Sequence, residues 1–381
     1  MPPRILILTA SVGEGHDLPA RTLGEQILAE RPDAEVLTED ALLSMGRIVQ
    51  WMSEDSATIV FYRFQFLWDV AFWVFARNRF TRRGTQWLLT RLGAPGLLRL
   101  IDRVQPDVIA SVYPNVTEVL GRLRRSGRLS IPVIAGITDL AAMHYWATPG
   151  ADVHLVTHAE SDAEVRDVAG QDAIVHCVHG FTKPEFLVPR AQADARAALG
   201  LAAEGGIVLV SGGGWGVGDV EGAVEEALAV DRVAQVVCLC GRNEALQERI
   251  ATRFAWEPRV RVEGFTEVMA EWMAAADVLV HSTGGLTVLE SIMRGSRPIS
   301  YGWGRGHIRL NNEGYRRFDL ADVVAERAAL RPTIEAALGR ERMPLNGFAE
   351  LPSAASFVLA AAARAGGSAA PERVGKLREL G

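Results

Sequence analysis

The sequence predicts an α/β protein with two tandem domains, each built from a parallel sheet and the helices that cover it. The 381 residues are enough for two separate cores, and 49% of them are hydrophobic. Apolar runs without period-two alternation recur along the chain between helix-like segments, which is typical of strands buried on both faces. This pattern stops over residues 188–204 and restarts at residue 206. We expect the two Rossmann-like sheets to face each other across a cleft.

The elements follow from these runs in chain order. The first series predicts strands at 4–10, 34–42, 106–114, 131–139 and 152–160. Helical patterns between them cover 18–32, 117–127 and 160–170. The second series predicts strands at 206–211, 234–241, 259–266, 277–283 and 297–303. Its helical patterns cover 244–254, 267–276 and 286–295. We therefore expect an N-terminal domain over 1–187, a linker over 188–204, a C-terminal domain over 205–350 and a helical tail over 351–381.

Composition excludes several classes of function. The net charge is −6 and the sequence pI is about 5.8, which disfavours a nucleic-acid partner held by bulk charge. Cys238 and Cys240 lie in an apolar run without a second ligand pair nearby, so we expect buried strand thiols and no metal site. The sequence shows neither a secretory signal nor an uncharged run of membrane-spanning length. We expect a protein of the reducing cytoplasm.

Residues 47–92 are rich in tryptophan and phenylalanine, with arginines interleaved among them. Aromatic rings favour the headgroup boundary of a bilayer, and arginines attract anionic lipid. We predict that residues 51–91 contact a membrane surface, which makes the protein peripheral on the cytoplasmic face. A helix pair packed in the core or at a dimer contact is the alternative.

The turn SVGEGH follows the first predicted strand and is a candidate for chemistry. Gly13 and Gly15 allow a tight turn and a close approach by an acceptor molecule. The third glycine of a dinucleotide fingerprint is missing, so that function is disfavoured. His16 ends the turn, and an imidazole that titrates near neutrality can accept a proton from a hydroxyl. A lone histidine is more often a surface or core residue, but its place at a strand end favours a catalytic role here.

A second polar group follows the strand 131–139. Asp139 ends that strand, and His144 and Trp146 come shortly after it. The carboxyl ends of parallel strands share one edge of the sheet, so these residues are expected on the acceptor side together with SVGEGH. Asp139 is then a candidate to orient His16, as carboxylates do for catalytic histidines. Its alternative role is a helix N-cap.

The second domain carries three motifs that suit an anionic sugar nucleotide. Glycine turns at 210–219 and 281–285 each follow a strand, and their backbone N–H groups favour a diphosphate. Glu290 lies one helical turn further on, where a carboxylate can bind the vicinal hydroxyls of a ribose. Asn311 and Asn312 offer donors and acceptors for a sugar. The alternatives are purely steric glycines, a solvated glutamate, and turn chemistry of the asparagines.

Together these blocks resemble the family 28 glycosyltransferases of GT-B fold, on the branch of monogalactosyldiacylglycerol synthases and diacylglycerol glucosyltransferases. The blocks include IPVIAGITDLAAMHYWATPGADVHLV, VEGFTEVMAEWMAAADVLVHSTGGLTVLESIMRGSRPI and GHIRLNN, in order over most of residues 4–325. The resemblance implies a GT-B fold, a UDP-sugar as donor substrate, no further cofactor, and inversion at the anomeric carbon. It implies that a hexose passes to the hydroxyl of a lipid such as diacylglycerol.

The resemblance also implies roles for single residues. His16 matches the general base, and Glu290 matches the residue that binds ribose. The backbone of Gly264, Phe265 and Thr266 matches the segment that holds uracil. The residues that match phosphate contacts are Gly213, Gly214, Thr283, Gly284 and Gly285. Asn311 or Asn312 falls where the donor sugar is read. Other functions on this fold are transfer to a soluble hydrophobic natural product, UDP-sugar epimerisation, and non-catalytic binding of a nucleotide sugar.

Overall fold

The computed structural model describes residues 2–10, 14–50, 78–141, 143–302, 306–343 and 347–366, and the side chains of 14–16, 79, 306, 307 and 366 are not described. The chain divides into two compact units. The first unit holds residues 1–181 together with 351–381, and the second holds 182–350. Most of the predicted aromatic and basic segment, residues 51–77, and Gly13 lie outside the described residues.

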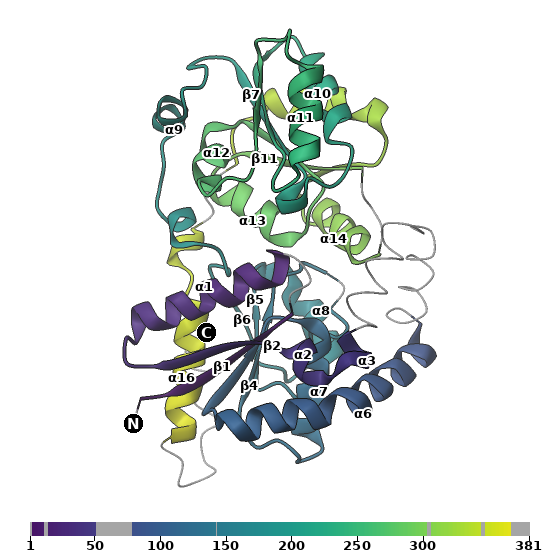
Figure 1. Cartoon of the computed structure of the whole chain (residues 1–381), viewed down its shortest axis with the longest axis vertical. Helices are drawn as coiled ribbons and strands as arrows, with labels where there is room; N and C mark the ends of the chain where they lie inside the picture. Colours follow the sequence, from purple (N-terminus) through teal and green to yellow (C-terminus); the bar gives the residue numbers. More distant parts are fainter. Residues whose placement is uncertain are drawn as a thin grey trace. The chain divides into compact units, whose positions relative to one another are not determined.

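The first unit is a parallel sheet covered by helices (Figure 1). Its strands lie in the order β2-β1-β3-β4-β5-β6, and every neighbouring pair is parallel. The strands are β1 (Arg4–Thr9), β2 (Glu35–Asp40), β3 (Val108–Ser111), β4 (Val133–Ile137), β5 (Val153–Val156) and β6 (Val175–Cys177). The helices are α1 (Glu14–Glu30), α2 (Ala41–Met45), α3 (Arg47–Gln50), α6 (Arg79–Val104), α7 (Pro114–Arg125), α8 (Asp162–Ala169) and α16 (Ala354–Gly366).

The second unit repeats this architecture. Its strands lie in the order β12-β11-β10-β7-β8-β9, again all parallel. The strands are β7 (Gly206–Ser211), β8 (Val233–Leu239), β9 (Val260–Glu263), β10 (Val278–His281), β11 (Arg297–Tyr301) and β12 (Asp322–Val324). The helices are α9 (Gln192–Leu199), α10 (Val220–Leu228), α11 (Glu244–Arg253), α12 (Met269–Ala275), α13 (Gly285–Met293), α14 (Gly306–Arg317) and α15 (Leu330–Leu338). The predicted α/β class with two parallel sheets is confirmed.

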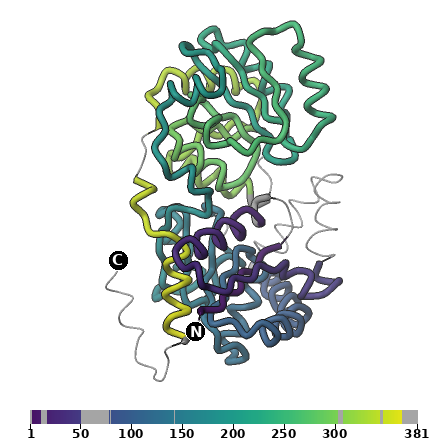
Figure 2. The backbone as a smooth tube through the Cα atoms, turned by 60° about the vertical axis from the view of Figure 1, so that its left-hand side comes forward, coloured from purple at the N-terminus to yellow at the C-terminus, as the bar shows by residue number. Residues whose placement is uncertain are grey.

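The boundaries of the units differ from the expected ones at two places. Residues 188–204 include α9 and belong to the second unit, so they are not a free-standing linker. The expected C-terminal tail contributes α16, which packs in the first unit through Ala354, Ala355, Val358 and Ala362. Figures 1 and 2 show α16 lying beside α1. Burial of small apolar side chains against the core around Ile5 is the physical reason for this return.

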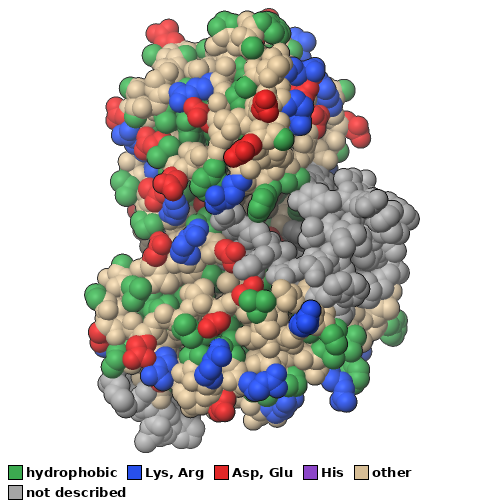
Figure 3. Space-filling view, viewed as in Figure 1, with side chains coloured by type: hydrophobic (Ala, Val, Ile, Leu, Met, Phe, Trp, Pro, Cys, Tyr) green, Lys and Arg blue, Asp and Glu red, His purple; other side chains and the backbone are tan. Residues whose placement is uncertain are grey.

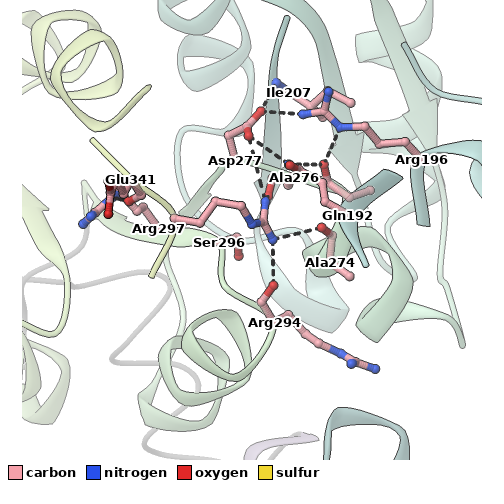
Figure 4. A network of polar contacts seen from close by, with 12 residues as sticks. Gln192, Arg196, Ile207, Ala274, Ala276, Asp277, Arg294, Ser296, Arg297 and Glu341 are labelled. Carbon is pink, nitrogen blue, oxygen red and sulfur yellow. Dashed lines mark hydrogen bonds and ion pairs between the residues drawn. The ribbon is translucent and has the colours of Figure 1, made fainter. Parts of the chain in front are cut away.

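A network of polar side chains secures the amino-terminal edge of the second sheet (Figure 4). Asp277 precedes β10 and accepts hydrogen bonds from Ile207 N–H at 2.8 Å and from the Arg196 guanidinium at 2.7 Å. The Gln192 amide donates to its other oxygen at 2.8 Å. Arg342 donates to the carbonyl oxygens of Ala274, Ala276 and Arg294. This network holds α9 and residues 341–343 against the sheet. It lies at the edge opposite to the one that carries the candidate site.

Candidate active site

The strand order of the second unit predicts a ligand site at the carboxyl ends of β7 and β10. The chain runs from β7 to β8 and β9 on one side, and from β10 to β11 and β12 on the other. The switch point between these two directions lies where β7 and β10 pair, with Ser211 opposite His281. In open α/β sheets a ligand binds outside the carboxyl ends of the strands at such a point. The two glycine turns predicted to hold a diphosphate follow these two strands.

The glycine turns are packed directly against each other. Gly213 has a φ of +71°, and a Cβ there would lie 2.7 Å from the Thr283 methyl group. The Ser282 hydroxyl donates to the Val217 carbonyl oxygen at 2.5 Å. Gly218 has a φ of +97° and adjoins the same Ser282 side chain. Only glycine fits these left-handed and crowded positions. The two turns therefore pack closely, and peptide groups rather than side chains form their surface.

His281 controls how Thr283 is oriented. Its Nδ1 accepts the Thr283 N–H at 3.2 Å and lies 3.1 Å from the Thr283 hydroxyl. Burial lowers the pKa of His281 to about 4, so the ring is neutral at pH 7. The Thr283 N–H is therefore directed at the imidazole. The helix α13 begins at Gly285 with Gly284 as its N-cap, and contact between their N–H groups and a phosphate stays a prediction.

Glu290 is a buried carboxyl group on α13, 7% exposed. Its pKa is raised to about 8, mainly by burial and also by the charge of Glu185, against the lowering effect of Lys183. No described residue donates a hydrogen bond to this carboxylate, so its oxygens are available to hydroxyl groups of a ligand. A buried charge is unfavourable without donors, and vicinal hydroxyls of a ribose would supply them. The structure therefore places Glu290 as predicted, on the helix that starts at the glycine turn.

The predicted uracil segment follows β9, two strands away from β7. Phe265 is 49% exposed. Thr266 accepts hydrogen bonds from the Trp272 indole at 3.0 Å and from Val268 N–H at 3.2 Å, so its hydroxyl secures the start of α12. The Arg242 guanidinium lies 3.8 Å from the centre of the Phe265 ring. Arg242 was not among the predicted site residues, although its place in the turn after β8 was a signal.

Asn311 and Asn312 lie in α14, where a loop leading into a helix was expected. Both side chains are buried. The Asn312 amide oxygen accepts a hydrogen bond from the Ser300 hydroxyl, at the end of β11, at 2.8 Å. The helix explains the difference, because Ile308, Asn311, Asn312 and Tyr315 form its buried face. Sugar reading by these asparagines stays a prediction, since Asn312 already has a partner within the fold.

The predicted acceptor-side residues follow two strands of the first sheet, β1 at its switch point and β4 two strands away. Its chain runs from β1 to β2 on one side and to β3 on the other. Gly15 and His16 lie in the first turn of α1, directly after β1, where a turn was expected at Gly15. Asp139 follows β4 and accepts a hydrogen bond from the Trp146 indole at 2.9 Å. The predicted action of Asp139 on His16 involves a side chain that is not described and stays a prediction.

The loop after β4 is under backbone strain and rests on charged helices. Tyr145 has a φ of +76°, a conformation that aromatic residues rarely adopt. Burial and the charge of Arg82 lower the pKa of His144 to about 4. Glu118 of α7 is buried nearby and pairs with Arg122 at 2.6 Å, and burial raises its pKa. Trp146 is buried and hydrogen-bonded to Asp139, so this loop packs at the carboxyl-terminal edge of the first sheet.

No group of three or more histidine, cysteine, aspartate or glutamate side chains able to hold a metal ion occurs among the described residues. Within the same ranges every helix is too short or too polar to cross a lipid bilayer. Cys238 and Cys240 are buried, with their sulfur atoms 3.8 Å apart, as expected for strand thiols.

Comparison with known proteins identifies the group of relatives. Residues 16–175 match the family described as monogalactosyldiacylglycerol (MGDG) synthase. The processive diacylglycerol beta-glucosyltransferase of Staphylococcus aureus strain MRSA252 is 24% identical over 293 residues, which cover 76% of this chain and 73% of that protein. The protein of the same description from strain Newman is similar to the same extent.

Solved structures share the fold. MurG of Acinetobacter baumannii superposes with a TM-score of 0.61 at 15% identity, over 96% of this chain and all of that one. Spinosyn rhamnosyltransferase SpnG gives a TM-score of 0.58 at 12% identity, over 94% of this chain and 99% of that one. Medicago truncatula UGT71G1, solved with UDP-glucose, gives 0.55 at 11% identity, over 97% and 95% of the two chains. The predicted GT-B fold and the predicted glycosyltransferase class are confirmed. The similarity to the MGDG synthase family over residues 16–175, and to diacylglycerol glucosyltransferases over three quarters of the chain, bears out the predicted resemblance to that branch of the family 28 glycosyltransferases.

Proposed function

We propose that this enzyme transfers a hexose from a UDP-sugar to the hydroxyl of a lipid acceptor such as diacylglycerol. The observation that carries the proposal is the switch point of the second unit, where two glycine turns adjoin the helix that bears the buried Glu290. Peptide N–H groups suit the diphosphate and the carboxylate suits the ribose. The relatives named as diacylglycerol glucosyltransferases, and a fold neighbour solved with UDP-glucose, support a lipid acceptor and a UDP-sugar donor.

The reaction is a single displacement with inversion. The acceptor oxygen attacks the anomeric carbon while the bond from that carbon to the diphosphate oxygen breaks, and its electron pair leaves with UDP. His16 accepts the proton of the acceptor hydroxyl as the new bond forms. Peptide N–H groups at the start of α13 stabilise the charge that grows on the diphosphate, and no metal ion is required.

An exposed apolar face of the first unit supports contact with lipid. Phe80 is 80% exposed and Trp87 is 58% exposed, both on α6, and Leu43 and Ile48 are exposed on α2 and α3. The Arg91 guanidinium lies 5.8 Å from the Trp87 ring. Apolar and basic side chains are exposed side by side on this unit (Figure 3). Such a surface favours peripheral binding at the cytoplasmic membrane face, and residues 78–91 form its described part.

A donor screen tests the proposal. The wild-type protein is incubated with diacylglycerol vesicles and one UDP-sugar at a time, and the lipid product is identified by mass spectrometry. His16→Ala should lose at least about 100-fold in kcat and still bind UDP, because general-base catalysis typically contributes that much or more. His176→Ala is the matched control, since His176 stacks on Phe357 in the first unit. Full turnover by His16→Ala would refute the role of the base.

The same screen separates the alternative functions. A transferase for a soluble natural product should not float with vesicles, whereas the proposed enzyme should. An epimerase would convert the UDP-sugar without any acceptor, and a binding protein would leave it unchanged. Absence of glycolipid with every donor would refute the proposed function.

A further inference from the structure

The turn after β8 brings Arg242 next to the glycine turn at the switch point. The Arg242 N–H donates to the Gly214 carbonyl oxygen at 2.8 Å. Gly241 has a φ of +60°, and a Cβ there would lie 2.5 Å from the carbonyl oxygens of Gly213 and Gly214. The Asn243 amide donates to the Trp215 carbonyl oxygen at 3.3 Å. The backbone of Arg242 is therefore fixed against the peptide groups that would face a diphosphate.

The Arg242 side chain lies over the face of Phe265 and is exposed to solvent. A cation over an exposed aromatic ring gains little, because water competes for the charge. A guanidinium bound to a phosphate makes paired, charge-assisted hydrogen bonds, which are considerably stronger. A phosphate beside the Arg242 backbone would thus bind the guanidinium more strongly than the Phe265 ring does.

The charges of the surrounding turns favour binding of a phosphate by Arg242. The turns after β7, β8, β9 and β10, at 212–219, 240–243, 264–268 and 282–284, are all described, and their charged residues are Asp219, Arg242 and Glu267. Asp219 caps α10 and accepts the Tyr301 hydroxyl at 2.8 Å. Arg242 is therefore the one cation in these four turns. A diphosphate bound there would have Arg242 as its nearest cationic partner on these turns.

We infer that Arg242 binds the diphosphate of the donor and stabilises the departing nucleotide. The inference rests on the proposed function and adds a catalytic residue to it. As the bond from the anomeric carbon to the diphosphate oxygen breaks, that oxygen gains an electron pair. The Arg242 guanidinium donates N–H hydrogen bonds to the diphosphate and transfers no proton. In the structure the guanidinium lies over the Phe265 ring.

Calorimetric binding of uridine, UMP and UDP tests the inference. Arg242→Ala should weaken UDP binding by at least about tenfold, because a hydrogen-bonded charge pair is lost. Uridine binding should not change, and Arg242→Lys should keep part of the UDP affinity. Arg249→Ala is the matched control, since Arg249 is an exposed arginine on α11 that pairs with Glu221 at 3.4 Å. The control should bind all three ligands like the wild type.

Two further measurements test whether Arg242 acts on the diphosphate. Arg242→Ala should also lower kcat, since the charge on the diphosphate grows in the transition state. Phe265→Leu should keep the preference for UDP over uridine, because the inference assigns contact with the diphosphate to the guanidinium and not to the ring. Equal weakening of uridine and UDP by Arg242→Ala, or no change in either, would overturn the inference. Lack of UDP binding by the wild-type protein would instead overturn the proposed function and, with it, the inference.

Discussion

The two edges of the second sheet are built in opposite ways. At the amino-terminal edge, Asp277, Arg196 and Arg342 pair with each other or with carbonyl oxygens. At the carboxyl-terminal edge the surface consists of glycine turns, with Glu290 buried beside them and Arg242 exposed. Paired polar groups stabilise a fold, whereas a buried carboxyl group without a hydrogen-bond donor, such as that of Glu290, is costly until a ligand binds. The difference indicates that one edge stabilises the unit and the other serves the ligand.

The largest expected effect is at the stabilising edge. Asp277→Ala removes the partner of Arg196, whose side chain is 6% exposed, and leaves that charge buried without its carboxylate. We expect the free energy of unfolding to fall by about 3 kcal/mol. Urea denaturation at pH 7 measures this loss. Asp33→Ala is the control, because its pair with Arg31 is on the surface, and it should leave the unfolding midpoint unchanged. An equal midpoint for both variants would contradict the comparison.

The second-largest expected effect is that of substituting Glu290, which should lower activity and raise stability. Glu290→Gln should lower kcat/KM for the donor by at least about tenfold, because the ribose hydroxyls favour the ionised form of Glu290 when the donor binds, and glutamine offers them only neutral hydrogen bonds. The same variant should be more stable than the wild type at neutral pH, since it no longer buries an ionisable group that the unfolded chain would ionise.

The pH dependence of this stability difference follows from the raised pKa. Below pH about 4.5, both states of the wild type hold the proton, and the difference should be small. Between pH about 4.5 and about 8 the unfolded chain loses the proton while the folded protein keeps it. The wild type should therefore lose stability relative to Glu290→Gln as pH rises, by about 1.4 kcal/mol per unit. Urea denaturation at several pH values tests this expectation. A stability difference between the two proteins that does not change with pH would contradict the raised pKa of Glu290.

The smallest effect tests the packing of the two glycine turns. Gly213→Ala places a methyl group at a left-handed position and against Thr283, and should lower the free energy of unfolding by about 1–2 kcal/mol. Thr283→Ser in the same background removes the methyl group that would be struck and keeps the hydroxyl near His281. Thr283→Ser should restore only the part of the lost unfolding free energy that is due to overlap of the two methyl groups. A double-mutant cycle measured by urea denaturation would show this. Complete restoration would mean that the backbone conformation is unstrained.

Much of the fold could be predicted from local sequence. The runs around Ile5, Val108 and Val208 are apolar throughout because their strands are buried on both faces, so each could be located without alternation. The glycine turns were equally visible, because their conformations require glycine. The family branch could be recognised because several such blocks occur in order.

Other features depend on contacts between distant segments. Nothing in the composition of residues 354–366 indicates that α16 packs with α1 in the first unit. In α14 the buried face carries Asn311 and Asn312, and these polar residues hide the helical pattern. Arg242 was missed because its significance comes from a contact with Phe265, 23 positions along the chain. Such contacts are set by the order of the strands, which apolar runs alone do not indicate.

The return of the chain to its first unit has a consequence for biosynthesis. The second unit is complete once residue 350 has left the ribosome, whereas the first must wait for Ala354, Val358 and Ala362. Until then the apolar surface that α16 covers stays open to water and to chaperones. Maturation of the amino-terminal half is thereby coupled to the synthesis of residues 354–366, and a polypeptide truncated before them would have one finished half and one unfinished half.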